Sequence, residues 1–436
     1  MKILVIGSGG REHAVIKSLS RSPKVTELHA APGNGGIASL ATCHAVNATD
    51  IDGVIALSKS LSVDLVFVTP DDPLVLGMVD ALEIAGIRAF GPHKNAAILE
   101  GSKSFSKAFM ARHNIPTADY KAFVGAEQAD DAVAYIKAQN SYPAVIKYDG
   151  LALGKGVIIA ENEGEAIDAI RSMLVDGKFS GGSSDSSVSK DKPSIVIEEY
   201  LDGVEVTVLA FTDGKVIVPM PASTDHKRAF DGDKGPNTGG MGVVTGVPYY
   251  TDAVATECME LIFLPTIKGM TSESRAFKGC LYFGLMLTKS GVKVIEYNCR
   301  FGDPEAQAVL PLLGNDCDLL EIVEAIIDER LGEISVKFAD KKAACVVMAS
   351  GGYPEKYQTG FTITGITECE QSGCEVFHAG TKLTGELVTS GGRVLAVTAV
   401  ADELKSALDL AYAGIAKIKF ENAHHRRDIG IKATLT

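Results

Sequence analysis

The chain has 436 residues, of which 46% are hydrophobic and 22% charged, and it carries a formal net charge of −13. This composition is typical of a globular protein with about two to four domains. The negative balance argues against a general affinity for nucleic acid or for an anionic membrane surface, and we expect neither as a partner.

The sequence carries no pattern for export or membrane insertion. Its first residues, MKILVIGSGG, are strand-like and too short for the hydrophobic region of a signal peptide, and no apolar run reaches about eighteen residues. The eight cysteines include no C-x-x-C pair, which argues against a zinc site or a redox dithiol. We therefore expect a cytoplasmic protein with reduced cysteines.

Strands and helices alternate over the first hundred residues. Apolar runs at 2–7, 28–33 and 64–70 predict strands, and helical periodicity follows from Arg11 and again near 52–61. Short turns with glycine or proline join them, which favours a doubly wound parallel sheet. We assign residues 1–102 to this amino-terminal α/β domain.

The second predicted domain, 103–327, begins where the FGPHKNAAILEGSK segment leads into a helix that runs to about Arg112. Inside it, a strand, helix and strand block with a further helix near 164–175 and a serine-rich loop at 177–193 predicts a mobile lid over 122–192. Strands at 194–201, 204–214 and 215–220 predict an antiparallel meander, and 281–298 predicts a hairpin. The pattern then changes, so residues 328–436 are expected to form a small α+β domain with a helix near 402–419.

GSGGREH, residues 7–13, follows the first strand and opens a helix, so its backbone amides could hold a phosphate. A dinucleotide fingerprint needs a third glycine where this chain has Glu12, and no acidic residue ends the second strand. A plain tight turn is the alternative. The motif therefore indicates a phosphate more readily than a nicotinamide cofactor.

A glycine-rich segment, DGLALGKGV at 149–157, differs from a P-loop because its spacing is one residue short and Gly156 replaces the metal-binding hydroxyl. It still presents Lys155 on a flexible turn, and Lys147 precedes it on an apolar strand, where a lysine needs an anion as partner. Further on, Glu198 and Glu205 offer acceptors for an adenine amino group or a ribose hydroxyl, although solvated strand ends would look the same.

Two later segments are unusual. The loop DHKRAFDGDKGPNTGGMG, 225–242, is long and polar inside a compact domain, which indicates function or disorder. In VIEYNCRFGDPE, 294–305, strand alternation places Glu296, Asn298 and Arg300 on one face, opposite Ile295 and its alternate neighbours. Two oxygen ligands at this spacing can reach one Mg²⁺ ion whose other ligands are water and phosphate.

Together these motifs resemble those of the phosphoribosylamine–glycine ligases, also called glycinamide ribonucleotide synthetases, of the ATP-grasp superfamily. The resemblance covers the whole chain in order, including PTADY, IEEYLDG and, near the end, GGYP, VFHAGT and GGRVL. Its most specific parts are DHKR with PNTGGMG, and NCRFGDPE. It implies an ATP-grasp core between the two flanking domains and a ligase that joins glycine to 5-phosphoribosylamine in purine synthesis, through a glycyl phosphate, with ADP and phosphate as products.

The resemblance also implies residue roles. It implies contacts to ATP from Lys103, Lys147, Gly154, Lys155, Gly156, Glu198, Tyr200, Leu201 and Glu205. It implies that Mg²⁺ or Mn²⁺ is bound by Glu296 and Asn298. It implies catalytic roles for Arg300, Lys155, Asp225, His226, Lys227 and Arg228. It implies contacts to the substrates glycine and 5-phosphoribosylamine from Gly9, Gly10, Arg11, Asp71, Asp72, Gly240 and Met241. We expect a monomer.

The chain departs from the family pattern at two places. Asp71 and Asp72 stand where a glutamate with a longer reach is usual, and Tyr148 and Leu153 replace small alanines beside the glycine-rich segment.

Three alternative functions remain. One is a superfamily ligase for another ribonucleotide, against which the DHKR loop argues, and another is an oxidoreductase, against which Glu12 argues. The third is a catalytically silent ATP-binding regulator, against which the presence of all three polar residues on the 296–300 face argues.

Overall fold

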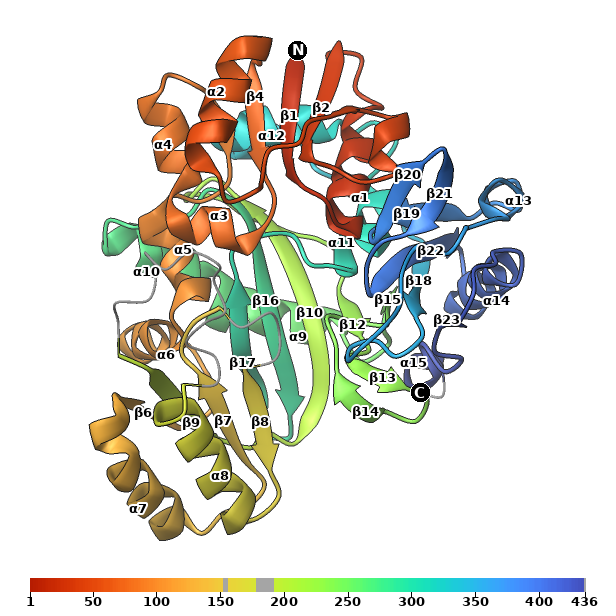
Figure 1. The fold of residues 1–436 in the computed structure, drawn as a ribbon. Helices are drawn as coiled ribbons and strands as arrows, with labels where there is room; N and C mark the ends of the chain where they lie inside the picture. Colours follow the sequence, from red (N-terminus) through yellow and green to blue (C-terminus); the bar gives the residue numbers. More distant parts are fainter. Residues whose placement is uncertain (152–155, 178–191, 435–436) are drawn as a thin grey trace.

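The computed structural model describes residues 1–151, 156–177 and 192–434 (Figure 1). The amino-terminal part is a five-stranded sheet in the order β3-β2-β1-β4-β5, with every pair parallel, which confirms the predicted sheet. Its strands are β1 (Lys2–Gly7), β2 (Glu27–Pro32), β3 (Thr42–Cys43), β4 (Leu65–Val68) and β5 (Ala89–Phe90). Its helices are α1 (Gly10–Leu19), α2 (Ile51–Leu61), α3 (Asp71–Leu76) and α4 (Met78–Ile84).

Strand β1 is apolar on both faces because each face meets a different core. Ile3 and Val5 share a core with side chains of α1. Leu4 and Ile6 share another core with side chains of α2 and α4. A parallel sheet covered on both sides requires this continuous apolar run, which the sequence shows.

A second, ten-stranded sheet contains only antiparallel pairs and runs in the order β17-β16-β10-β12-β15-β18-β22-β19, with β11 beside β10 and β23 beside β18. The pairing of β15 with β18 carries this sheet from the predicted second domain into the predicted carboxyl-terminal one without a break (Figure 1). Its strands are β10 (Gly203–Thr212), β11 (Ile217–Pro219), β12 (Ser223–Asp225), β15 (Gly242–Thr245), β16 (Gly279–Thr288), β17 (Gly291–Asn298), β18 (Lys342–Ser350), β19 (Glu375–His378), β22 (Arg393–Ala401) and β23 (Ala423–His424).

The predicted hairpin at 281–298 is confirmed as β16 and β17, but the predicted meander is only partly correct. Strands β10 and β11 pair as expected. The strand before them, β9 (Ser194–Glu199), belongs instead to a separate four-stranded sheet in the order β6-β9-β7-β8. The reason is that both edges of β10 are occupied: β16 pairs along its whole length, Gly203–Thr212 with Gly279–Thr288, and β11 and β12 pair with the other edge.

The four-stranded sheet and two helices form a small body with its own core, seen at the bottom of Figure 1. Its strands beside β9 are β6 (Tyr120–Val124), β7 (Ala144–Tyr148) and β8 (Val157–Ala160), and its helices are α7 (Ala129–Gln139) and α8 (Glu163–Leu174). It overlaps the predicted lid region, 122–192, and extends beyond both ends of it, so we call the described residues of 120–199 the lid.

The helix expected to run to about Arg112 is confirmed, and a separate helix precedes it, divided from it at Ser102. The Ser102 hydroxyl accepts a hydrogen bond from the amide of Phe105 at 3.1 Å and so caps the second helix, which makes Lys103 its first residue. The two helices are α5 (Lys94–Gly101) and α6 (Lys103–Arg112).

The remaining helices and hairpins pack around the two sheets. The helices are α9 (Asp252–Cys258), a π-helical turn (Met259–Phe263), α10 (Leu264–Ser272), α11 (Glu305–Val309), α12 (Leu319–Ile327), α13 (Ile366–Glu370), α14 (Leu404–Ile415) and α15 (Ile431–Thr434). Short 3-10 turns lie at Ile37–Ser39, Ala126–Gln128, Leu310–Leu312 and Leu331–Glu333. The hairpins are β13 (Arg228–Phe230) with β14 (Lys234–Asn237), and β20 (Thr381–Thr384) with β21 (Glu386–Thr389). Among the described residues, no helix combines the length and apolar character needed to cross a membrane.

Candidate active site

Strand β17 carries the predicted metal ligands on one face. Glu296 and Asn298 are half-buried, whereas Tyr297 and Cys299 are buried in the core. The predicted alternation fails at Ile295, because the pairing with β16 skips one residue there and leaves a β-bulge. The bulge has a consequence: the Ile295 carbonyl accepts a hydrogen bond from Lys147 Nζ at 3.1 Å. Lys147 therefore lies directly beside the strand that carries Glu296.

Lys147 belongs to a buried cluster with two lysines on one carboxylate. Glu198 Oε2 lies 3.0 Å from Lys147 Nζ and 3.0 Å from Lys107 Nζ, and all three residues are buried. Lys107 also donates to Thr117 Oγ1 at 2.7 Å. Within the described part of the chain, Glu198 Oε1 has no hydrogen-bond partner. The cluster thus keeps one free acceptor and one excess positive charge.

Lys107 was not among the predicted site residues. A signal for it exists, because Lys103 and Lys107 are four residues apart on α6 and so share a face of that helix. Burial lowers the pKa of Lys107 to about 8, even though Glu198 opposes the shift. Lys103 Nζ donates to the Gly150 carbonyl at 2.9 Å, at the start of the glycine-rich segment.

Arg300 is fixed by carboxylates that come from the first part of the chain. Its Nη2 lies 3.1 Å from Glu100 Oε1 and 3.9 Å from Asp71 Oδ2, and it donates to Asn298 Oδ1 at 3.3 Å. Burial raises the pKa of Glu100 to about 7 against the opposing charge of Arg300. Sequence reasoning missed Glu100, because a lone glutamate in a helix carries no motif.

The other aspartate of the 71–72 pair, Asp72, is at the amino-terminal end of the same short helix, α3, as Asp71. Burial, and then the charge of Asp71, raise the pKa of Asp72. The structure therefore brings Asp71 to Arg300, whereas it shows no ion pair for Asp72 among the described residues.

Glu296 and Asn298 fit a divalent cation. Burial by itself would raise the pKa of Glu296, but the charges of Lys227, Lys147 and Lys103 outweigh it and lower that pKa, so the carboxylate is ionised. Within the described residues, no group of three or more histidine, cysteine or acidic side chains could hold a metal ion. Two oxygen donors suit Mg²⁺ or Mn²⁺, whose remaining ligands come from water and phosphate, and the neighbouring ammonium groups suit the phosphate rather than the cation.

At the start of the loop 225–242, successive side chains point in alternate directions, some toward Glu296 and others away from it. Asp225 and Lys227 face the strand region of Glu296: Lys227 forms an ion pair with Glu205 on β10, and Asp225 Oδ1 is buried without a partner in the described chain. The Arg228 guanidinium donates to the Gly235 carbonyl at 2.8 Å within its own hairpin.

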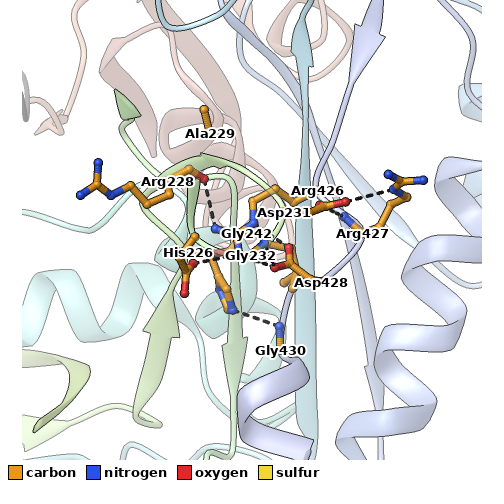
Figure 2. A network of polar contacts seen from close by, with 12 residues as sticks. His226, Arg228, Ala229, Asp231, Gly232, Gly242, Arg426, Arg427, Asp428 and Gly430 are labelled. Atoms are coloured by element: carbon orange, nitrogen blue, oxygen red, sulfur yellow. Dashed lines mark hydrogen bonds and ion pairs between the residues drawn. The ribbon is translucent and has the colours of Figure 1, made fainter. Parts of the chain in front are cut away.

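His226 contacts the carboxyl-terminal segment rather than the group around Glu296 (Figure 2). Its Nδ1 donates to the Gly242 carbonyl at 3.2 Å, and its Nε2 accepts from the amide of Gly430 at 3.0 Å. Burial, followed by the charge of Arg426, lowers the pKa of His226 to about 4. Both ring nitrogens are thus engaged in a neutral imidazole, which leaves no site for proton transfer to a substrate.

The GSGGREH turn lies against the turn that follows β17. Arg11 Nη1 donates to the Phe301 carbonyl at 3.2 Å, and its Nε pairs with Glu12 Oε1 at 2.8 Å. A Cβ atom on Gly9 would lie 3.1 Å from Asp303 Oδ2, and one on Gly10 would lie 2.4 Å from Gln307 Nε2. Only glycine at these two positions permits so close a contact.

The remaining predicted residues are spread around this region. Tyr200 is exposed and Leu201 half-buried in the link between β9 and β10, while Gly240 and Met241 are buried next to Asp225 and His226. Gly156 accepts from the amide of Tyr148 at 2.7 Å. Leu153, Gly154 and Lys155 lie outside the described residues.

Known proteins resemble this chain over its whole length. Residues 1–100, 101–306 and 343–432 match the N, ATP-grasp (A) and C domains of the phosphoribosylglycinamide synthetase family. Phosphoribosylamine–glycine ligases from Halalkalibacterium halodurans and Clostridium acetobutylicum are both 44% identical, over 99% of this chain and 97% and 99% of theirs.

Solved structures agree with these matches. The crystal structure of the phosphoribosylamine–glycine ligase of Thermotoga maritima is 31% identical, with a TM-score of 0.81, over 98% of this chain and 100% of that one. A biotin carboxylase from Campylobacter jejuni, 14% identical, has a TM-score of 0.71 over 97% of this chain and 92% of that one, which shows a shared fold only. The resemblance seen in the motifs is thus confirmed, and so is the ATP-grasp fold: the chain belongs to the phosphoribosylglycinamide synthetase family, whose members are ligases that use ATP with a divalent metal.

Proposed function

We propose that this protein joins glycine to 5-phosphoribosylamine at the expense of ATP and forms glycinamide ribonucleotide, ADP and phosphate. A glycine carboxylate oxygen attacks the γ-phosphorus and ADP leaves. The amine nitrogen then attacks the carbonyl carbon of the glycyl phosphate, and phosphate leaves as the nitrogen loses a proton. The observation that carries this proposal is the meeting of Glu296, Asn298 and Arg300 with Lys147 and Lys103 in a chain of this family.

ATP is proposed to lie between the lid and β17. Lys103 and Lys147 hold its phosphates, and the excess positive charge of the Lys107 cluster attracts them further. Glu198 Oε1, buried and without a described partner, accepts from the adenine amino group. Backbone groups of Tyr200 and Leu201 border the ring, and the Gly154–Gly156 segment with Lys155 covers the phosphates.

Glu205, on β10, is proposed to hold the ribose of ATP. It shares its carboxylate with Lys227 of the 225–242 loop, so the nucleotide and the substrate loop meet at this ion pair.

Mg²⁺ or Mn²⁺ is proposed to be held by Glu296 and Asn298, and such an ion neutralises charge on the transferring phosphoryl group. Arg300 steadies the acyl phosphate with a guanidinium whose direction Glu100 and Asp71 fix. This chemistry depends on position and charge rather than on a protein nucleophile.

The substrates are proposed to lie on the same face of β17 as Glu296, next to the phosphates of ATP, because Lys227 of the 225–242 loop faces that carboxylate. Asp225, Lys227, Gly240 and Met241 surround glycine, and the Gly9–Arg11 turn with Asp71 and Asp72 holds the phosphoribosylamine. We assign His226 and Arg228 to positioning of the loop, because their side chains are engaged by other parts of the protein.

The domain limits 1–102, 103–327 and 328–436 and closure of the region 122–192 over ATP are part of this proposal. So are a cytoplasmic location and action as a monomer.

The test is release of phosphate with each substrate omitted in turn. We expect turnover only when ATP, glycine and phosphoribosylamine, generated from ribose 5-phosphate and ammonia, are all present. Glu296→Ala should lower kcat by about 100-fold or more with no change in the fold measured by circular dichroism, because it removes a ligand of the charge-neutralising cation. Turnover with another amino acid but not with glycine would overturn the assignment.

A further inference from the structure

Arg393, the first residue of β22, reaches two turns of the proposed substrate site from the carboxyl-terminal part of the chain. Its Nη1 donates to the Asp303 carbonyl at 2.7 Å, to the Gly239 carbonyl at 2.8 Å and, more weakly, to the Gly240 carbonyl at 3.4 Å. Its Nη2 lies 3.4 Å from Asp303 Oδ2. One guanidinium therefore links the NTGGMG turn to the FGDPE turn.

Two local features of the backbone set the position of this guanidinium, a β-bulge beside Arg393 and a glycine at position 239. The pairing of β22 with β18 is irregular next to Arg393, because Met348 pairs with Leu395 but Ala349 with Arg393. Such a bulge changes the direction of a side chain. At the other end, a Cβ atom on Gly239 would lie only 3.0 Å from Arg393 Cζ, so glycine lets the guanidinium lie close to the turn.

The FGDPE turn is also held from the amino-terminal part of the chain. Arg11 Nη1 donates to the Phe301 carbonyl at 3.2 Å, two residues before the carbonyl that Arg393 binds. Gln307 Nε2 donates to Asp303 Oδ1 at 2.7 Å. Arginines from two separate parts of the sequence thus fix a single turn.

We propose that Arg393 is a positioning residue for the phosphoribosylamine substrate. By binding the carbonyls of Gly239 and Asp303 it fixes the two turns against the Gly9–Arg11 turn, which completes the substrate side of the site. This inference rests on the proposed function. Within the described residues, no hydrogen bond or ion pair joins Arg393 to the ATP-side residues Lys103, Lys147 or Glu198, so its loss affects the substrate side.

Arg393 places Nη1 on carbonyls of both turns while Nη2 lies beside the Asp303 carboxylate. A lysine carries a comparable charge and three donors on one nitrogen, but its side chain is one bond shorter and has no second nitrogen for the Asp303 carboxylate. Arg393→Lys is therefore expected to retain part of the function that Arg393→Met loses.

The test compares steady-state kinetics of these variants with those of the wild type. We expect Arg393→Met to raise KM for phosphoribosylamine by about 10-fold or more, with KM for ATP within about 2-fold of wild type, and Arg393→Lys to fall between them. Gly239→Ala, which crowds the guanidinium without removing it, should raise the same KM and gives the same readout if Arg393→Met does not fold.

Arg21→Ala is the matched control. Arg21 also joins the amino-terminal and carboxyl-terminal parts, through Glu375 at 3.3 Å, but it is exposed and belongs to neither turn. It should leave all three KM values unchanged. An unchanged KM for phosphoribosylamine in Arg393→Met and Gly239→Ala, or an equal rise in all three KM values, would overturn the inference. A wild type that does not use glycine and phosphoribosylamine would instead overturn the proposed function.

Discussion

The buried cluster of Lys107, Lys147 and Glu198 combines stability with binding at the scale of single residues. Two buried ammonium groups would repel each other, and desolvation disfavours both, unless a carboxylate lies between them. Because both lysines contact Oε2, the carboxylate is held so that Oε1 remains free for a ligand. In the proposed ATP site, Lys107 would therefore act on the nucleotide through Glu198.

Replacing Lys107 with methionine should weaken ATP binding. The variant retains the Lys147–Glu198 pair, but the excess positive charge beside the phosphates disappears and Glu198 loses one of its two fixed contacts. We expect Kd for ATP, measured by titration calorimetry, to rise by about 10-fold. Lys121→Met, at an exposed lysine of β6, serves as the control and should bind ATP as the wild type does. An unchanged Kd in Lys107→Met would refute the role of this lysine.

Sequence alone predicted the residues of the 225–228 run but not their directions. It identified Asp225 to Arg228 as a group, and the structure divides them between two sides. The partners of His226 include Gly430, 204 residues away in the chain. No local sequence pattern reveals a contact between residues so far apart. A residue that binds substrate and a residue that only positions the loop therefore look the same in the sequence.

At the scale of elements, the hydrophobic periodicity predicted most strands correctly, and its failures involve pairing. Nothing in VKVIEYN marks the bulge at Ile295, since a bulge is defined against the partner strand. The sequence likewise predicted that the apolar strands β9 and β10 pair with each other, although each pairs with segments farther away in the chain. Periodicity reports which face of a strand is buried, whereas the choice of partner depends on contacts made by the whole fold.

The two segments that connect the lid to the body both contact β17. On entry, the Pro116 carbonyl accepts from the amide of Val294 at 2.8 Å, and Thr117 Oγ1 donates to the Val294 carbonyl at 2.7 Å. On exit, Glu199 Oε1 lies 2.7 Å from Lys293 Nζ. Together with the separate core of the lid, this geometry favours rotation of the lid as one body about residues 116–119 and 199–203.

We predict that ATP closes the lid. Bound phosphates attract Lys147 on the lid and Lys103 on the body at the same time, which favours the closed arrangement. Small-angle X-ray scattering should show a smaller radius of gyration with a non-hydrolysable ATP analogue and Mg²⁺ than without them. Adenosine, which lacks the phosphates, is the control and should produce little change. Identical scattering with and without the analogue would contradict lid closure.

At the scale of the whole molecule, the three parts inferred from sequence are not independent bodies in the structure. One core contains Ile3 of the first sheet, Phe301 beside the site and Phe377 of the carboxyl-terminal part. The ten-stranded sheet also crosses the predicted boundary near 328 through the pairing of β15 with β18. Among the hydrophobic cores of the described residues, only that of the lid takes all its members from one part of the chain. Composition and periodicity locate the parts, but they do not show that the parts share a core.

The part of the protein outside the lid contains buried histidines that are neutral in the folded state. Burial is the main cause that lowers the pKa of His13 to about 3 and the pKa values of His226 and His378 to about 4. The unfolded chain binds these protons at its ordinary pKa, near 6.5, so between pH 6.5 and 4 it binds more protons than the folded chain. The stability from these groups is fully present above pH 6.5 and is lost as the pH falls through that range.

We predict that His226→Gln flattens this dependence. Arg426 lowers the pKa of His226 while Asp233 and Asp428 oppose it, and none of these three residues is changed in the variant. The free energy of unfolding of the wild type, measured by urea titration at several pH values from 7 to 4.5, should fall more steeply than that of the variant. The difference in slope is at most about 1.4 kcal/mol per pH unit, which corresponds to one proton.

The variant is expected to be less stable than the wild type at pH 7, because the ring contacts to Gly242 and Gly430 are altered. His93→Gln, at a half-buried surface histidine that pairs with Glu83, should retain the wild-type slope. Parallel curves for the wild type and His226→Gln would show that His226 is not kept neutral by the fold.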